Sequence, residues 1–300
     1  RPRQGHGKAT DRQSHMRLAL APLRRLYGKT LAVEFGPRKL KAVREDIIAD
    51  GYRRRGGLNR KYVNDHIRII KRMFRWCVGE ELLPREQGAS ICSVLDSVEN
   101  LRKNEDHRVT ESTKVKSVPD GDVTRTLPFM SPQIRTMVQL LQLTGMRPDE
   151  VTVMRPMDIS QRKDIWLYRP ELHKLEHKDI ERVVPLGPTA QELLTPWLNR
   201  DQTAYLFSPR EVVEANHDRT RKNKRTQVKK NTRWQPRDHY DDESLCQAVT
   251  RACDKASVPK WTPGQLRHSV ATRVTSQFDR ETARQLLGHG SASTTDIYVD

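Results

Sequence analysis

The sequence predicts a mainly α-helical protein with one small antiparallel β-sheet, arranged in two domains. Apolar residues recur at steps of three or four over most of the 300 residues, which is the spacing of amphipathic helices. Two short runs, residues 165–168 and 182–186, are β-branched or aromatic and predict two paired strands. A polar stretch at residues 106–125 separates two periodic regions, as an interdomain linker would.

The first periodic region, residues 16–105, predicts a helical domain that follows a basic arm or linker at residues 1–15. Pro37 opens a helix whose expected stop is Gly51. Asn59 is a good N-cap for the next helix, which is expected to end at Gly79. The polar face of this helix is either merely solvated or a DNA-binding face, and its charge favours DNA binding through Arg60, Lys61, Arg68, Lys71, Arg72 and Arg75.

The second periodic region, residues 126–300, predicts further helices around the small sheet. A helix over residues 132–143 is expected to end at Thr144-Gly145, and Pro148 opens a short helix that reaches Val153. After the two strands, helices are expected over residues 188–198, 245–256, 266–278 and 280–287, with Gly288 closing the last.

The charge balance favours a polyanionic partner. Lys and Arg number 55 and Asp and Glu 38, which gives a formal net charge of +17 at pH 7. Residues 219–237 are rich in Lys and Arg and hold no acidic residue, so this segment is expected either to bind phosphates or to be a solvated, flexible insertion. The DNA-binding residues expected there are Arg221, Lys222, Lys224, Arg225, Lys229 and Lys230.

Several function classes lack their usual signals. No stretch approaches the roughly 18 consecutive apolar residues of a membrane-spanning helix, and no apolar signal core follows the basic start, so a cytoplasmic protein is expected. The four cysteines form no CxxC pair, which favours reduced thiols over a metal site. The sequence has no Gly-rich phosphate loop, HExxH or GxSxG, and no cofactor is expected.

Four motifs follow one another in the second region: Thr144 to Val151 (TGMRPDEV), Leu266 to Ser269 (LRHS), Leu286 to His289 (LLGH) and Thr294 to Tyr298 (TTDIY). Their content and order resemble the tyrosine recombinase (phage integrase) family. The resemblance covers residues 126–300 and, more loosely, the basic helical region before them. It implies a helical core-binding domain, a mixed α+β catalytic domain, and a C-terminal segment beyond Asp300.

Five residues match the family's catalytic positions: Arg147, Lys174, Arg267, His289 and Tyr298. Lys174 would lie in the turn between the two strands, and Lys178 is the alternative because this turn is slightly long. The resemblance implies that Tyr298 attacks a DNA phosphate to leave a 3′-phosphotyrosyl link and a free 5′-hydroxyl. The hydroxyl then attacks the same kind of link in a partner strand.

These residue types also suit the reaction on physical grounds. Two guanidinium groups can neutralise the oxygens of a phosphodiester in fixed directions. A free tyrosine has a pKa of about 10, so a nucleophilic Tyr298 needs nearby cations that favour its phenolate. A lysine held in a turn against the DNA can protonate the leaving 5′-oxygen. Bond energy is conserved, so the reaction requires neither ATP nor a metal ion.

One position departs from the family pattern. The family usually has a histidine three residues before the second arginine, and Gly264 stands there in this chain. The usual general base or hydrogen-bond partner is therefore absent, which lowers the expected efficiency of cleavage. His268 follows Arg267 but would lie roughly 100° around a helix from it, so a structural role is favoured over a substituting one.

We therefore expect a site-specific DNA recombinase that integrates or excises a mobile element in a prokaryotic cell, associated with the nucleoid when it binds DNA. The resemblance implies a homotetramer on two double-stranded DNA sites. Two alternatives stay open: a catalytically silent DNA-binding relative, and a strand-passing enzyme like a type IB topoisomerase. The presence of all five matching residues favours an active enzyme over a silent one.

Overall fold

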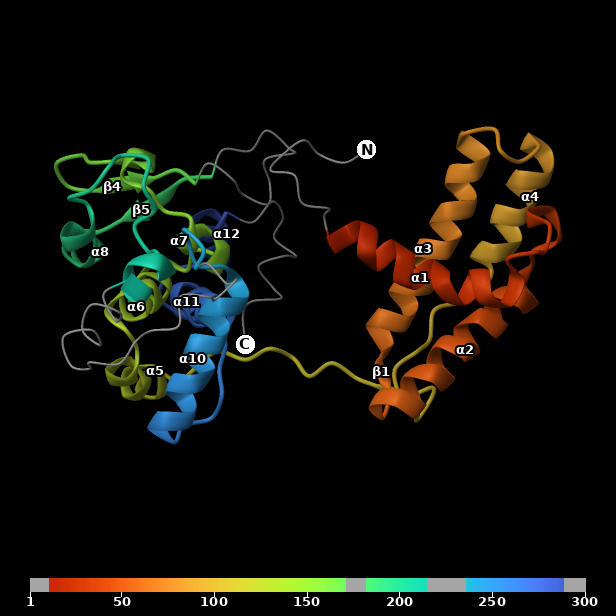
Figure 1. The fold of residues 1–300 in the computed structure, drawn as a ribbon, viewed down its shortest axis with the longest axis horizontal. Helices are drawn as coiled ribbons and strands as arrows, with labels where there is room; N and C mark the ends of the chain where they lie inside the picture. The colour runs from red at the N-terminus through yellow and green to blue at the C-terminus, as the bar shows by residue number, and fades with distance from the viewer. Residues whose placement is uncertain (1–10, 171–181, 215–235, 289–300) are drawn as a thin grey trace, which may run out of the picture. The chain divides into compact units, whose positions relative to one another are not determined.

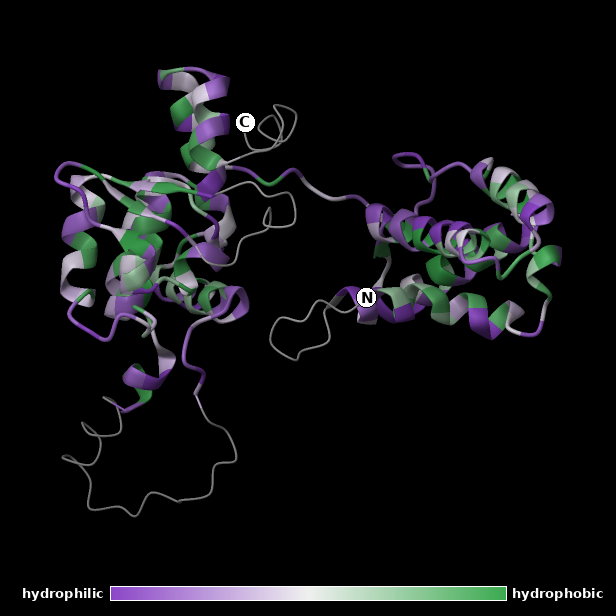
Figure 2. Cartoon of the chain, turned by 90° about the horizontal axis from the view of Figure 1, so that it is seen from above, coloured by the Kyte–Doolittle hydropathy of each residue, from purple (hydrophilic) through white to green (hydrophobic). Residues whose placement is uncertain are grey.

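The computed structural model describes residues 11–170, 182–214 and 236–288. The chain forms two compact units that divide between Lys114 and Val115 (Figure 1). Each unit has its own apolar core, and the hydrophobic sides of its helices turn toward one another (Figure 2). The predicted fold class, mainly helical with a small antiparallel sheet, is confirmed. In the described residues, no helix is long and apolar enough to cross a membrane.

The N-terminal unit is built on α3, which packs against α1 and α4. The side chain of Asn59 accepts a hydrogen bond from the backbone N–H of Lys61 and so caps α3, as the sequence predicts. Val63, Ile67 and Ile70 are buried along its apolar face. The elements of this unit are α1 (Asp11–Tyr27), a 3-10 turn (Ala32–Glu34), α2 (Pro37–Arg55), β1 (Leu58–Asn59), α3 (Arg60–Gly79), α4 (Arg85–Asp96) and β2 (Val109–Thr110).

The C-terminal unit packs helices α6 and α8 against strand β5 of a three-stranded sheet. The strand order is β3-β4-β5, with both pairs antiparallel and Tyr168 opposite Ile159 on one side and Val184 on the other. The core of this unit includes the large, fully buried side chains of Met137, Tyr168 and Phe207. The elements are α5 (Asp120–Thr126), α6 (Pro132–Thr144), α7 (Pro148–Thr152), β3 (Ile159–Ser160), β4 (Trp166–Tyr168), β5 (Val184–Leu186), α8 (Pro188–Leu194), α10 (Asp242–Ala256), α11 (Pro263–Gln277) and α12 (Arg280–Leu287), with 3-10 turns at Leu127–Phe129, Pro156–Asp158 and Thr195–Trp197.

Helix ends in the C-terminal unit follow the predicted signals. Gly145 ends α6 with φ +62°, and Gly288 ends α12 with φ +64°, a left-handed conformation that favours glycine. Pro148 occupies the first turn of α7, as predicted. Both glycines lie inside motifs, Gly145 two residues before Arg147 and Gly288 immediately before His289.

The structure corrects several boundaries. Helix α1 begins at Asp11, inside the predicted arm, and α2 continues through Gly51 to Arg55, because Gly51 is buried and its missing Cβ accommodates the side chain of Leu58. The predicted linker is too long at both ends, since β2 pairs within the N-terminal unit and α5 buries Val123 in the C-terminal one. Strand β3 and helix α4 were not predicted.

Candidate active site

Arg267 joins three of the predicted motifs. It lies in the second turn of α11, and its side chain is almost wholly buried, with the residue 3% exposed. Its Nη1 donates a hydrogen bond to the backbone oxygen of Gly145 at 2.7 Å, two residues before Arg147. Its Nη2 donates to the backbone oxygen of Leu287 at 2.5 Å, at the end of α12. The LRHS motif therefore contacts both the TGMRPDEV and LLGH motifs, which are far apart in the sequence.

The backbone at Gly145 fits tightly between these segments. A Cβ on Gly145 would lie 2.7 Å from Leu287 Cδ2 and 2.9 Å from Val270 Cγ1, closer than real Cβ contacts come. Together with the positive φ, this approach requires glycine in the turn that leads to Arg147. The turn is thus held in place by packing as well as by hydrogen bonds.

Arg147 is fixed by Glu150, one turn further along the chain. The carboxylate accepts hydrogen bonds from the backbone N–H of Arg147 at 2.8 Å and from its Nη1 at 2.8 Å. The side chain of Glu150 is fully buried, whereas that of Arg147 keeps 17% of its surface exposed. Arg147 is therefore oriented by a buried partner while its side chain stays partly exposed.

Glu150 is charged and surrounded by cations. Burial works to raise the pKa of Glu150, but Arg182, Arg147 and Arg267 outweigh this effect and hold the pKa below its ordinary value. Tyr168 donates from its hydroxyl to the backbone oxygen of Glu150 at 2.6 Å. A single buried carboxylate among three arginines leaves the cluster positive, which suits an anionic substrate.

Neither Glu150 nor Arg182 is predicted from the sequence as a site residue. Glu150 stands within the TGMRPDEV motif, and its place three residues after Arg147, at the start of a short helix, was the available signal. Arg182 was placed in a predicted strand, where its burial could not be foreseen, because a charged residue next to a β-branched run is usually exposed.

Gly264 and His268 lie on the same helix in different surroundings. Gly264 is the second residue of α11, and a Cβ built on it would meet nothing within 4 Å. His268 is buried, and its Nδ1 is covered. The position at which the family usually has a histidine is therefore open, whereas His268 belongs to the interior of the unit. Lys174, Lys178, His289 and Tyr298 lie outside the described residues.

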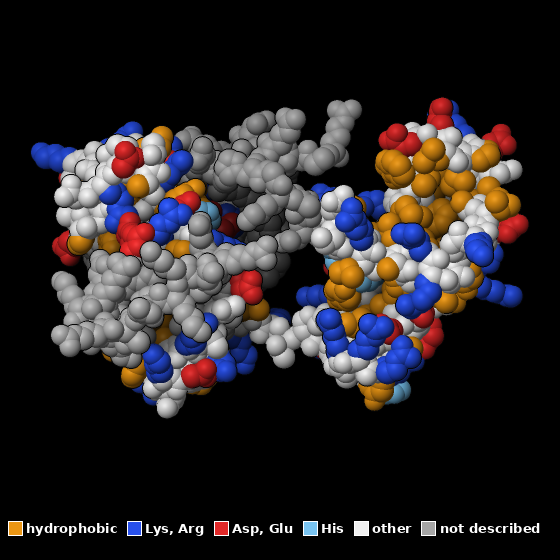
Figure 3. All heavy atoms as spheres, viewed as in Figure 1, with side chains coloured by type: hydrophobic (Ala, Val, Ile, Leu, Met, Phe, Trp, Pro, Cys, Tyr) orange, Lys and Arg blue, Asp and Glu red, His pale blue; other side chains and the backbone are white. Residues whose placement is uncertain are grey.

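The predicted DNA-binding residues of α3 divide into two groups. Lys61, Arg68, Arg72 and Arg75 are exposed, and Figure 3 shows Lys and Arg side chains spread over the visible face of this unit. Arg60 is half-buried and donates to Glu111 at 2.7 Å and to the Leu101 carbonyl at 3.3 Å. Lys71 donates to the Val98 carbonyl at 2.6 Å, and burial lowers its pKa.

Half of the exposed group also has acidic neighbours. Arg68 pairs with Asp65, and Arg75 pairs with Asp96 at 2.5 Å, whereas Lys61 and Arg72 form no ion pair with a described residue. Lys61 and Arg72 are therefore the best placed to contact phosphates. The predicted residues between Arg221 and Lys230 lie outside the described part of the chain.

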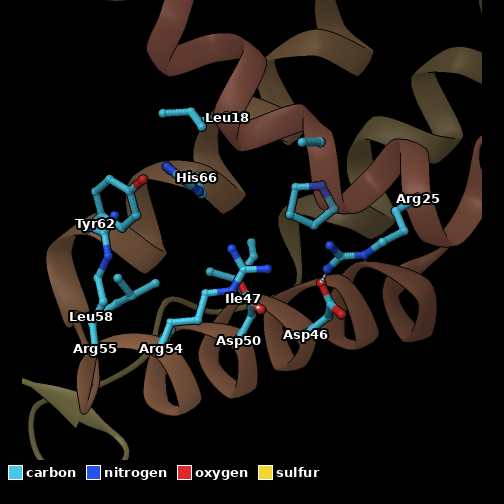
Figure 4. A pocket seen from close by; sticks show the side chains of 13 residues that line it. Leu18, Arg25, Asp46, Ile47, Asp50, Arg54, Arg55, Leu58, Tyr62 and His66 are labelled. Carbon is cyan, nitrogen blue, oxygen red and sulfur yellow. Dashed lines mark hydrogen bonds and ion pairs between the residues drawn. The ribbon is translucent and has the colours of Figure 1, made fainter.

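A cavity of about 350 Å³ lies in the N-terminal unit between α1, α2 and α3 (Figure 4). Arg25 pairs with Asp46, and Arg54 pairs with Asp50. His66 lies against Tyr62 with ring centroids 4.1 Å apart, and burial, then the nearby His15, lowers the pKa of His66 to about 4. Because none of the motif residues lies in this unit, the cavity is not the candidate active site.

A helical unit followed by an α+β unit in which two motif arginines converge is the architecture expected of a tyrosine recombinase. The model of the phage integrase family matches residues 122–300. Tyrosine recombinase XerC of Yersinia pestis is 26% identical over 251 residues, which cover 82% of this chain and 70% of that protein. An integrase/recombinase of Escherichia coli is 29% identical over 237 residues, covering 71% of this chain and 66% of that protein.

Solved structures agree in fold. A lambda integrase dimer bound to a COC′ core site superposes with a TM-score of 0.65 at 14% identity, covering 99% of this chain and 73% of that chain. The XerH recombinase bound to its difH substrate gives a TM-score of 0.58 at 17% identity, covering 95% and 76%. The chain belongs to the phage integrase family, as its motifs predict, and is by family a DNA breaking and rejoining enzyme.

Proposed function

We propose that this chain is a site-specific DNA recombinase that cleaves and rejoins DNA through a 3′-phosphotyrosyl intermediate on Tyr298, in the integration or excision of a mobile element. The observation that carries the proposal is the pair of hydrogen bonds from Arg267 to Gly145 and Leu287. These bonds bring Arg267 together with the turn that leads to Arg147 and with Leu287, which lies two residues before His289. Such a cluster is what attack on one phosphate requires.

The two arginines bind the scissile phosphate. Arg147 has a partly exposed side chain, and Glu150 sets the orientation of its guanidinium. Arg267 donates from each terminal nitrogen to a backbone carbonyl, which fixes its guanidinium between Gly145 and Leu287. Their charges stabilise the crowded negative charge of the transition state and favour the phenolate of the attacking tyrosine.

The remaining steps rest on the motif residues. Tyr298 attacks the phosphorus atom, and the DNA 5′-oxygen leaves with a proton from Lys174, for which Lys178 is the alternative. His289 would join the two arginines in favouring the phenolate of Tyr298. In rejoining, the 5′-hydroxyl of the partner strand attacks the phosphotyrosyl link and releases the tyrosine.

Double-stranded DNA is the proposed substrate, and a homotetramer on two sites the proposed assembly. The net charge of +17 and the exposed residues Lys61 and Arg72 support DNA binding by the N-terminal unit. A lambda integrase tetramer bound to a Holliday junction has a similar fold, with a TM-score of 0.61 at 14% identity. Action on the nucleoid of a prokaryotic cell belongs to the same proposal.

A nicked suicide substrate tests the reaction. A target site is first selected from genomic flanks, and the protein is then incubated with that site carrying a nick beside the cleavage position. We expect a denaturant-resistant protein–DNA adduct with the wild type and with Tyr52→Phe, which changes an exposed tyrosine of the N-terminal unit, and none with Tyr298→Phe. Adduct formation by Tyr298→Phe would contradict the proposal.

The open position at Gly264 favours one alternative, a silent DNA-binding relative. That alternative predicts salt-sensitive, site-specific binding and no adduct with any of the three proteins. Relaxation of supercoiled DNA without a preferred site would instead indicate a topoisomerase-like enzyme.

A further inference from the structure

Arg182 connects three parts of the candidate active site. It lies two residues before β5, and the residue is 4% exposed. Its Nε donates to Oε1 of Glu150 at 3.3 Å, and its Nη1 donates to the backbone oxygen of Leu286 at 3.0 Å. One guanidinium therefore holds the strand, the carboxylate that orients Arg147, and the end of α12.

The end of α12 is held by two arginines. The last carbonyls of a helix lack partners within the helix, and basic side chains can satisfy them. Arg182 binds the carbonyl of Leu286, and Arg267 binds that of Leu287. Arg182 also packs against the next residue, because a Cβ on Gly288 would lie 2.8 Å from its Nη1. This contact is immediately before His289 in the sequence.

Arg182 and Arg147 share the carboxylate of Glu150 as a hydrogen-bond acceptor. Oε1 of Glu150 accepts from Arg147 Nη1 at 2.8 Å and from Arg182 Nε at 3.3 Å. With Arg147 alone, the carboxylate would neutralise the guanidinium that must bind a phosphate. The second guanidinium balances Glu150, so that Arg147 keeps its net attraction for an anion.

A role in stability alone does not account for these contacts. A buried charge that serves only stability is expected to have all its donors satisfied. Nη2 of Arg182 is buried and has no hydrogen-bond partner among the described residues. Nε binds Glu150, the partner of Arg147, and Nη1 binds the helix end beside the carbonyl bound by Arg267 and, at 3.4 Å, the backbone oxygen of Val183.

We propose that Arg182 is a positioning residue for DNA cleavage, which aligns Arg147 through Glu150 and fixes the end of α12. The inference rests on the proposed function. Arg182 is then a third arginine of the site. It does not touch the phosphate and acts through Glu150 and the end of α12.

The test compares Arg182→Met and Arg182→Lys with the wild type on the nicked substrate, under single-turnover conditions at saturating DNA. Arg284→Met is the matched control, because it removes an arginine of α12 that pairs with Glu281. We expect Arg182→Met to slow adduct formation about 100-fold, with a Kd for DNA within about threefold of the wild type. Lysine keeps the charge but not the fork of donors, so Arg182→Lys should recover only part of the rate.

The pH profile separates positioning from stability. Removing Arg182 takes away the first of the charges that lower the pKa of Glu150, so the acidic limb of the cleavage rate should move to higher pH in Arg182→Met. If Arg182→Met does not fold, Arg182→Lys provides the test. We expect its rate of adduct formation to fall at least about tenfold while its Kd for DNA stays unchanged.

Three results overturn the inference in distinguishable ways. A cleavage rate of Arg182→Lys within about threefold of the wild-type rate, with an unchanged pH profile, refutes the positioning role. The proposed function is unaffected by that result. A lower melting temperature without a change in the cleavage rate of the folded variant assigns Arg182 to stability. No adduct with the wild type refutes the proposed function, and the positioning role with it.

Discussion

Replacing Gly145 with alanine tests the tight junction of the three motifs. The new methyl group would occupy a residue at φ +62°, where a side chain adds about 1–2 kcal/mol of strain. It would also lie 2.7 Å from Leu287 Cδ2 and 2.9 Å from Val270 Cγ1, and overpacking of this kind adds about 1–3 kcal/mol. We therefore expect the free energy of unfolding to fall by about 2–5 kcal/mol.

Unfolding in guanidinium chloride, followed by tryptophan fluorescence, measures this loss of stability. The signal reports mainly on the C-terminal unit, because Trp76 alone of the five tryptophans lies in the N-terminal one. The matched control is Gly121→Ala in α5, where a Cβ meets nothing within 4 Å, and a gain of about 0.4–1 kcal/mol is expected. A loss below about 1 kcal/mol for Gly145→Ala would refute the tight junction.

Three further outcomes are expected. Glu150→Gln breaks the buried ion pairs and should lower stability at pH 7 by about 3–5 kcal/mol. Because the folded-state pKa of Glu150 is lowered, this difference should shrink as the pH falls below about 4.5, which denaturation at both pH values measures. Arg72→Ala should weaken DNA binding and reduce the salt slope by about one, whereas Arg60→Ala should mainly lower the melting temperature. Gly264→His should fold, because its Cβ position is open, and form the adduct up to about 100-fold faster.

Each of these has a contradicting result. An equal loss at pH 7 and at about pH 3 in Glu150→Gln would mean that the charge of Glu150 is not what stabilises the fold. Unchanged salt dependence in Arg72→Ala would remove α3 from the DNA interface. Slower adduct formation by a folded Gly264→His would show that this open position is needed by the DNA or by another group.

Local signals predicted most helices of the C-terminal unit. Pro148, Gly145 and Gly288 act through backbone conformation, which depends on few neighbours, so their effect can be inferred from the sequence. Gly51 misled the prediction because the same residue type can end a helix or make room within one, and here it makes room for Leu58. Strand β3 was missed because two residues carry no periodicity.

The candidate site was predictable in its motif residues and not in its connections. The motif order placed Arg147 and Arg267, but their link through Gly145 and Leu287 joins residues that are 122 and 20 positions from Arg267. Charge periodicity places Arg60 and Lys71 on the polar face of their helix. It does not show that Glu111 binds Arg60 or that the Val98 carbonyl binds Lys71.

Mapping the covalent bond between protein and DNA shows whether Tyr298 is the nucleophile. The adduct from the nicked substrate is digested with protease and nuclease, and the remaining nucleotide-bearing peptide is identified by mass spectrometry. We expect one modified peptide, with a 3′-linked nucleotide on Tyr298. A nucleotide on any other residue, or a 5′ linkage on Tyr298, would contradict it.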